Sequence, residues 1–222
     1  MNIYLLTLIG DGMLEQQRTL YLALYNPRTM MRVMERLREL GLQFKGVYER
    51  QRAIYGVVMV DEEGYRYLED NSVRILGPLV FVDDVDKAVA HALVLAKGLD
   101  FPLSNLVVGI DLGASIGFAV VGDSKVLMTK LFVSKLKFFE TLCWVIEKFE
   151  SKRRCIRIGF TRSTFDDYKA DIVDRIAKMI PSDVELELVP ERGSSKLRPG
   201  IVTRGLHEDE IAALNIALGR TS

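Results

Sequence analysis

The sequence is poor in cysteine, tryptophan and histidine, with two, one and two of these residues in 222 positions. Cys143 and Cys155 are not arranged in the closely spaced pairs that zinc sites use, so we expect both to be core thiols. No stretch of 18 or more residues lacks charged side chains, and no basic segment precedes the apolar run at the N-terminus. These absences argue against a membrane span and a secretory signal, and they favour a cytoplasmic protein with no membrane partner.

An excess of one charge is also missing, because 30 basic residues balance 30 acidic ones. The net charge therefore gives no overall argument for a nucleic-acid partner. The distribution is uneven, however. Residues 148–162 hold six Lys or Arg against one Glu, and residues 192–204 hold four with no acid. Such clusters are typical either of phosphate contacts or of a solvated face.

A chain of 222 residues that is 49% apolar can bury one large core or two modest ones, and the pattern favours two domains. We expect residues 1–100 to form a small α/β domain, and Gly98 to Ser104 to be the linker. This domain contains no recognisable chemical motif, and it could recruit a protein partner or shape a substrate cleft. Its predicted elements are strands Ile3–Ile9 and Ile54–Val60, helices Pro27–Leu40, Glu62–Leu68 and Asp83 or Asp84 to Lys97, and apolar segments Val73–Leu76 and Leu79–Val82.

Residues 105–222 predict a second α/β domain built on a five-stranded mixed sheet flanked by helices. Short connections indicate that its first three strands are antiparallel, and each of the last two follows a helix. The expected elements are strands Leu106–Asp111, Ile116–Val121 and Lys125–Val133, helix Ser134–Glu150, strand Cys155–Phe160, a helix from Ser163 or Thr164 to Met179, strand Val184–Val189 and helix Glu208–Leu218. In the helix after Ser134, the spacing predicts a buried face of Leu136, Phe139, Leu142, Cys143, Ile146 and Phe149.

Asp111 stands out because it ends an apolar strand, immediately before a second run punctuated by glycine. An ionised carboxylate beside Ile110 and Leu112 is costly to desolvate unless a cation or hydrogen bonds compensate it. Asp111 could bind only the backbone amides of the turn from Gly113 to Gly117. Alternatively, it belongs to a metal or phosphate site.

Further acids lie where strand ends and the last helix could meet Asp111. Glu191 follows the fifth strand, and Glu210 lies in the first turns of the last helix, on the same face as His207. Converging carboxylates repel one another unless a divalent cation neutralises them, and oxygen ligands suit Mg²⁺ or Mn²⁺. Two such metals would support hydrolysis of a phosphodiester.

Three segments carry a family resemblance over residues 105–222, which resemble the ribonuclease H-like superfamily, nearest its RuvC and YqgF branch. GIDLG at 109–113 is similar to the motif that ends the first strand in that branch, and ERGSS at 191–195 resembles a segment after the fifth strand. HEDEIAALNIAL at 207–218 resembles the final helix, which in the family carries a catalytic Asp, in some members with His three residues earlier. The resemblance implies a ribonuclease H-like domain with metal-dependent endonuclease or resolvase-like activity on DNA or RNA.

The resemblance also implies roles for individual residues. Asp111 would bridge two metals, Glu191 and Glu210 would complete the carboxylate set, and His207 would bind metal or transfer a proton. Resolvases of this type have a Glu on the fourth strand, but residues 156–160 hold no carboxylate, so the third ligand must be Glu191 or be missing. The candidates for contacts to nucleic acid are Arg192, Ser194, Ser195, Lys196, Arg198 and Arg204.

Two other functions are compatible with the same residues. The clusters at 152–162 and 192–204 could hold structured DNA or RNA without cleavage, in a catalytically inactive module of the same fold. GIDLG also resembles the phosphate-binding strand of actin-like and sugar-kinase ATPases. That function needs a second phosphate hairpin and an adenosine segment in a further domain, for which the residues after Asp111 are too few.

Overall fold

A computed structural model describes residues 18–47, 51–160, 166–190 and 205–219, and these form two compact α/β units. The first unit ends at Phe101 and the second begins at Pro102. Among the described residues, no helix combines the length and the apolar character needed to cross a membrane. The predicted strand Ile3–Ile9 lies outside the described residues.

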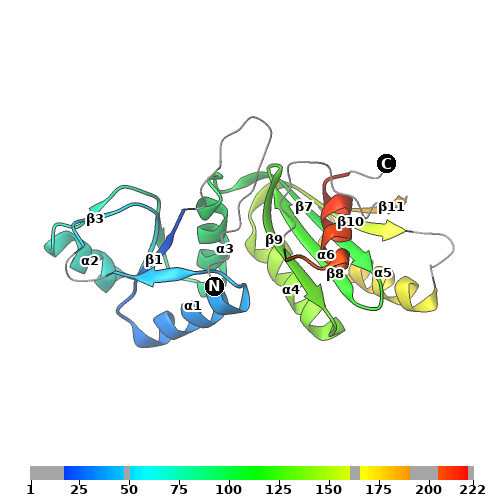
Figure 1. The fold of residues 1–222 in the computed structure, drawn as a ribbon, viewed down its shortest axis with the longest axis horizontal. Helices are drawn as coiled ribbons and strands as arrows, with labels where there is room; N and C mark the ends of the chain where they lie inside the picture. The colour runs from blue at the N-terminus through cyan, green and yellow to red at the C-terminus, as the bar shows by residue number, and fades with distance from the viewer. Residues whose placement is uncertain (1–17, 48–50, 161–165, 191–204, 220–222) are drawn as a thin grey trace. The chain divides into compact units, whose positions relative to one another are not determined.

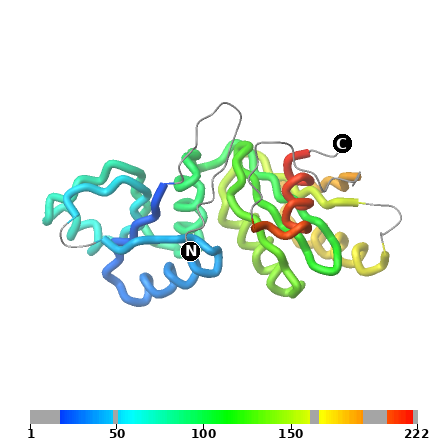
Figure 2. Tube along the Cα trace, viewed as in Figure 1, coloured from blue at the N-terminus to red at the C-terminus, as the bar shows by residue number. Residues whose placement is uncertain are grey.

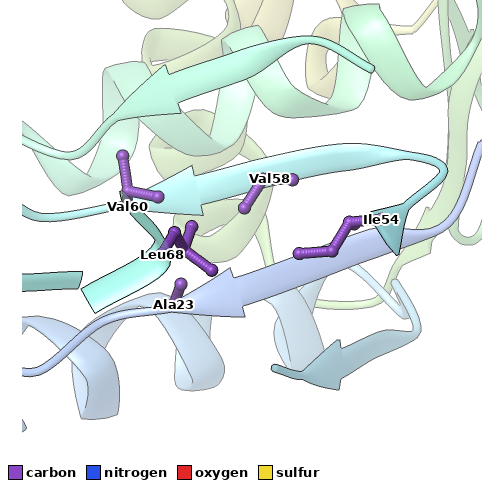
Figure 3. Close-up of a cluster of buried hydrophobic side chains, with 5 residues drawn as sticks. All are labelled: Ala23, Ile54, Val58, Val60 and Leu68. Carbon is purple, nitrogen blue, oxygen red and sulfur yellow. The ribbon is translucent and has the colours of Figure 1, made fainter. Parts of the chain in front are cut away.

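The first unit is built on a four-stranded parallel sheet in the order β2-β1-β4-β6, with a two-stranded sheet of β3 and β5. Its elements are β1 (Leu20–Ala23), α1 (Pro27–Glu39), β2 (Phe44–Gly46), β3 (Ala53–Ile54), β4 (Val57–Val60), α2 (Glu62–Asp70), β5 (Arg74–Ile75), β6 (Leu79–Phe81) and α3 (Val85–Ala96). All four residues of β4 are buried, as expected for a parallel strand covered on both faces. One of its core clusters joins Ala23, Ile54, Val58, Val60 and Leu68 (Figure 3).

The carboxyl ends of β1 and β4 are joined through one side chain, Asp61. Its Oδ2 accepts hydrogen bonds from the amides of Tyr25 and Asn26 at 2.8 and 2.7 Å, and its Oδ1 caps α2 by accepting from the amide of Gly64. A Cβ on Gly64 would lie 1.7 Å from the carbonyl oxygen of Ala23, so α2 begins directly against the end of β1. A parallel sheet of this kind binds ligands most often where its strand order reverses, and here the Asp61 carboxylate occupies that position between β1 and β4.

The second unit contains a five-stranded sheet in the order β11-β10-β7-β8-β9. Strands β7, β8 and β9 are antiparallel neighbours, while β10 and β11 run parallel to β7. The mixed sheet with three antiparallel strands is therefore confirmed. Its elements are β7 (Leu103–Leu112), β8 (Ile116–Gly122), β9 (Lys125–Phe132), α4 (Lys135–Lys148), β10 (Ser151–Phe160), α5 (Asp167–Met179), β11 (Val184–Pro190) and α6 (Glu208–Ala217) (Figures 1 and 2).

The two faces of this sheet carry side chains of different size. On one face, the buried rings of Phe118, Phe132 and Phe138 pack edge to face, which joins β8 and β9 to α4. The guanidinium of Arg175 on α5 lies 4.4 Å from the ring centroid of Phe139, so α5 borders α4. Helix α6 covers the other face (Figure 1), where Gly109, Gly117 and Ala119 are the small residues beneath it. Small residues let α6 approach the sheet more closely than large ones would.

A tight hairpin connects β8 to β9. Asp123 and Ser124 both have positive φ angles, 44° and 69°, which is typical of the two-residue turn that matches strand twist. The Asp123 side chain accepts hydrogen bonds from the amides of Ser104 and Asn105. The short connection predicted between the strands that end at Val121 and begin at Lys125 is confirmed, and the Asp123 carboxylate also fixes the start of β7.

Several boundaries differ from those expected from the sequence. Strands β1 and β2 were not predicted. The predicted strand Ile54–Val60 is two strands in different sheets, because the chain bends at Gly56, where a Cβ would lie 2.3 Å from the carbonyl oxygen of Thr19. The N-cap of α5 is Asp166, a later residue than either predicted cap.

The predicted inner face of α4 was also wrong in part. Leu136 is 67% exposed, whereas Phe138, absent from the predicted face, is fully buried. The apolar pattern of α4 is broad, with Phe138 and Phe139 adjacent, so spacing alone fits two helix orientations. Contact with Phe118 and Phe132 selects the orientation that buries Phe138.

Candidate acidic site at the end of β7

Helix α6 lies directly on the backbone of β7 and β8 because two glycines leave room for it. A Cβ on Gly109 would lie 2.1 Å from the carbonyl oxygen of Ala213, and a Cβ on Gly117 would lie 2.0 Å from that of Asp209. Asp209 and Ala213 are one helical turn apart, so one stripe of α6 faces the two glycines. This stripe continues to Ala217, whose amide lies 2.6 Å from the Cβ position on Gly109.

These contacts fix the direction of α6. Its first turn lies at Gly117, which is directly opposite Asp111 in the pairing of β7 with β8. Side chains alternate between the faces of a strand, so Asp111 shares the α6 face with Gly109. Directly opposite residues of an antiparallel pair have Cβ positions roughly 5 Å apart. The amino end of α6 is therefore brought to Asp111, which is half-buried.

Asp209 is held in place from the hairpin that follows Asp111. The hydroxyl of Ser115, in the turn between β7 and β8, donates a short hydrogen bond to Oδ2 of Asp209. The Asp209 side chain is only 27% exposed. A partly buried carboxylate with a hydroxyl donor on one oxygen retains lone pairs for a further ligand.

The predicted site residues His207 and Glu210 form the cap of α6. Oε2 of Glu210 accepts a hydrogen bond of 3.0 Å from the His207 amide, and Nδ1 of His207 accepts from the Asp209 amide at 3.4 Å. Reciprocal bonds of this kind satisfy backbone donors that the first helical turn leaves unpaired. The structure thus gives both side chains a structural task, and their predicted roles at a metal stay predictions.

The first turn of α6 concentrates negative charge at this end of the sheet. Glu208, Asp209 and Glu210 all lie in the first turn of α6, and the partial positive charge of the helix amino end stabilises carboxylates there. Asp111 adds a further carboxylate from β7, where helix and strand end meet. Carboxylate oxygens are ligands that Mg²⁺ and Mn²⁺ prefer, so the chemistry of Asp111 and Asp209 is compatible with a hard divalent cation, although among the described residues no three His, Cys, Asp or Glu ligand atoms gather within 4.8 Å here.

Asp111, His207 and Glu210 lie at the same end of the sheet, but among the described residues no three His, Cys, Asp or Glu ligand atoms that include one of them lie within 4.8 Å of one another, so the predicted site stays a prediction. The same end of the sheet also holds Asp209, which the sequence analysis overlooked. The signal for Asp209 was available: Asp209, Ala213 and Ala217 repeat every four residues, as expected for a helix face that packs on glycines. The remaining site predictions lie outside the described residues, namely Glu191, Arg192, Ser194, Ser195, Lys196, Arg198 and Arg204.

The basic cluster at 148–162 does not gather at this site, at least over its described part. Strands β10 and β7 are parallel, and Arg153 pairs with Asn105 near the start of β7. At ~3.3 Å per residue, Arg153 is about 20 Å along the sheet from the level of Asp111. Arg154 binds Asp183 in an ion pair. The guanidinium of Arg157 donates to the carbonyl oxygen of Ala217, where it closes the carboxyl end of α6.

A second group of possible metal ligands lies on β10 and β11. Ligand atoms of Cys155, Glu185 and Glu187 lie within 4.8 Å of one another, the only such trio among the described residues. Nε of Arg157 is 2.7 Å from Glu187, so a cation already occupies part of this group. Burial, followed by the charge of Glu187, raises the pKa of the Cys155 thiol to about 11. Because metal ligation needs the thiolate, this trio is a poor metal site.

Comparison with known proteins adds no family assignment, since no protein-family model and no curated protein matches the chain.

Proposed function

We propose that this protein is a divalent-metal-dependent endonuclease, resolvase-like, that acts on structured nucleic acid. The observation that carries the proposal is the seating of Asp209 against Gly117, directly opposite Asp111. Two acids from distant parts of the sequence thereby reach one end of the sheet. Such a pair is the minimum needed to hold a cation against a phosphodiester.

The architecture of the second unit supports a ribonuclease H-like assignment. It has the five-stranded mixed sheet, three antiparallel strands and flanking helices that the resemblance implies. The GIDLG segment ends its central strand, and the final helix lies beside it. The acidic position on that helix that best fits a metal ligand is Asp209 rather than Glu210, whose side chain closes the helix cap.

Each residue of the proposed site would have its own role. Asp111 and Asp209 would hold Mg²⁺ or Mn²⁺, and Glu191 remains the candidate for a third carboxylate. When bound, the metal lowers the pKa of a water molecule and neutralises charge on the phosphate. Ser115 orients Asp209 through its hydroxyl hydrogen bond. Candidates for phosphate contacts remain Arg192, Ser194, Ser195, Lys196, Arg198 and Arg204.

The test is cleavage of branched DNA and structured RNA with Mg²⁺ or Mn²⁺, comparing wild type with Asp111→Asn and Asp209→Asn. Each substitution should lower the cleavage rate roughly 100- to 1,000-fold, because each removes a metal ligand. Glu208→Gln is the matched control, since Glu208 is an exposed acid in the same helical turn. Cleavage by both Asn variants at the wild-type rate would overturn the assignment of the site.

A catalytically inactive nucleic-acid-binding module is the second candidate function. One observation favours it: among the described residues, no trio of ligand side chains includes Asp111. In this case wild type would bind structured nucleic acid, but neither metal would support cutting. The same cleavage assay, paired with a binding measurement, distinguishes the two functions.

A further inference from the structure

Strand β9 and the first turn of α4 form a basic segment outside both clusters noted in the sequence. Residues 124–139 contain four lysines and no acid. Lys130 lies on β9, and Lys135 and Lys137 lie in the first turn of α4. We call these three residues the lysine surface.

The topology places the carboxyl end of β9 at the same end of the sheet as Asp111. Strand β9 is antiparallel to β8, which is antiparallel to β7, so β9 and β7 run in the same direction. Phe132 at the end of β9 pairs with Ile116, which pairs with Leu112 beside Asp111. Two strand spacings of ~4.8 Å put the end of β9 about 10 Å across the sheet from the end of β7. This span equals roughly three base pairs of duplex, at ~3.4 Å each.

The first turn of α4 has the opposite charge from those of its neighbours. Helices α5 and α6 begin with acids, whereas α4 has none in its first turn and carries Lys135 and Lys137 there. The partial positive charge at a helix amino end disfavours lysine and favours an anion. A bound phosphate would relieve this repulsion and contact the lysines at the same time.

Apolar side chains lie among these lysines. Val133 is 89% exposed and Leu136 is 67% exposed, next to Lys135 in the sequence. Nζ of Lys135 lies 3.9 Å from the ring centroid of Tyr168, at the start of α5. Nucleic acid offers sugars and bases beside its phosphates, which these apolar side chains would contact.

Within the lysine surface, one carboxylate competes for a lysine. Glu140 is 3.2 Å from Nζ of Lys137, and both side chains are more than half exposed. Exposed pairs of this kind stabilise little, so Lys137 is readily released to a phosphate.

We propose that the lysine surface binds the phosphate backbone of the nucleic-acid substrate and guides it toward Asp111 and Asp209. The inference rests on the proposed function, because it assigns the substrate contacts of the same unit. Charge complementarity selects the partner: the three lysines, of which Lys137 pairs with Glu140, favour a polyanion, while the acidic site at the same end of the sheet would repel one. The lysines therefore supply attraction that the site itself lacks.

The test uses the full chain with Asp111→Asn, so that binding is measured without cleavage and without divalent cations. Fluorescence anisotropy of a labelled four-way DNA junction and an RNA hairpin would be recorded over a range of salt concentrations. The double variant Lys135→Ala, Lys137→Ala should weaken binding about tenfold. The slope of log affinity against log salt should fall by nearly two, at ~0.9 per lost phosphate contact.

The matched control is Arg28→Ala, Arg32→Ala, which removes the same charge from exposed residues of α1 in the first unit, outside every basic cluster named above. This control should bind within about twofold of the parent, and thermal melting checks that both double variants are folded. Equal weakening by both double variants would show a response to net charge alone and overturn the proposal. Unchanged binding by the Lys135→Ala, Lys137→Ala variant would also overturn the proposal. The absence of binding by every protein tested would overturn it too, and would point to an acidic protein partner.

The outcomes also separate this inference from the proposed nuclease activity. Binding that depends on Lys135 and Lys137, without metal-dependent cutting by wild type, would keep the surface and reject the nuclease. Cutting that is unaffected by the two lysines would keep the nuclease and reject the surface.

Discussion

Ser115 donates a hydrogen bond to Asp209, and this contact links the hairpin after Asp111 to the first turn of α6. The two residues are separated by 94 positions in the sequence, so only the folded sheet brings them together. The bond fixes one oxygen of Asp209, in the turn of α6 that lies against Gly117, directly opposite Asp111. Removing this hydrogen bond therefore tests most directly whether this end of the sheet is organised for a ligand.

Replacing Ser115 with Ala should weaken metal binding and cleavage about 10- to 100-fold, because an orienting partner of a ligand is lost. The stability of the second unit should change little, since Ser115 is only half-buried. Titration with Mn²⁺ followed by calorimetry measures the affinity. Ser104→Ala on the exposed start of β7 is the matched control. Equal metal affinity in wild type and Ser115→Ala would contradict an organising role.

Gly117→Ala should destabilise the second unit by about 1–3 kcal/mol, because its new Cβ would lie 2.0 Å from the backbone of Asp209. It should also displace Asp209 and lower cleavage. In the nearby turn, a Cβ on Gly113 meets only the Ser115 carbonyl oxygen, at 3.3 Å, so Gly113→Ala should be tolerated far better. Urea unfolding of both variants gives the comparison. Similar loss in the two would mean that α6 does not lie closely on β8.

Cys155 should react slowly with alkylating reagents near pH 8, because burial and the nearby Glu187 raise the pKa of its thiol to about 11. The raised pKa also affects stability. The folded chain retains this proton up to about pH 11, whereas an unfolded thiol with the ordinary pKa of 9.0 loses it earlier. The contribution to stability is therefore present below pH 9.0 and is lost as the pH rises through about 11.

Melting temperatures recorded from pH 8 to pH 11 test this linkage, with Cys155→Val as the comparison. Both proteins lose stability at high pH through other groups, but the loss should be steeper in wild type. Parallel curves for the two proteins would exclude a linked Cys155 proton.

Asp61→Ala should destabilise the first unit by about 2–4 kcal/mol, because three backbone amides lose a carboxylate acceptor and α2 loses its N-cap. Hydrogen exchange of the Tyr25, Asn26 and Gly64 amides should accelerate more than exchange in β7. The control is Asp70→Ala, at the exposed end of α2. Unchanged protection of these amides would show that Asp61 does not join β1 to β4.

The sequence by itself determined most of the elements and their order in the second unit. Apolar runs with short connections predicted β7, β8 and β9, and capping residues such as Ser134 marked where helices begin. These features are local, because turn chemistry and side-chain spacing act within a few residues. For the same reason Asp111 could be identified as an unusual acid without knowledge of its neighbours.

Only the tertiary structure decided which acid of the final helix lies against Gly117, opposite Asp111, and which basic segment reaches the same end of the sheet. The first choice depends on the rotation of α6 about its axis, which Gly109 and Gly117 set by admitting Asp209 and Ala213. The choice of basic segment depends on strand direction. Strand β9 finishes at the same end of the sheet as Asp111, whereas Lys152 and Arg153 lie near the start of β10, at the opposite end. Both are contacts between segments far apart in the chain, and no local pattern of side chains encodes them.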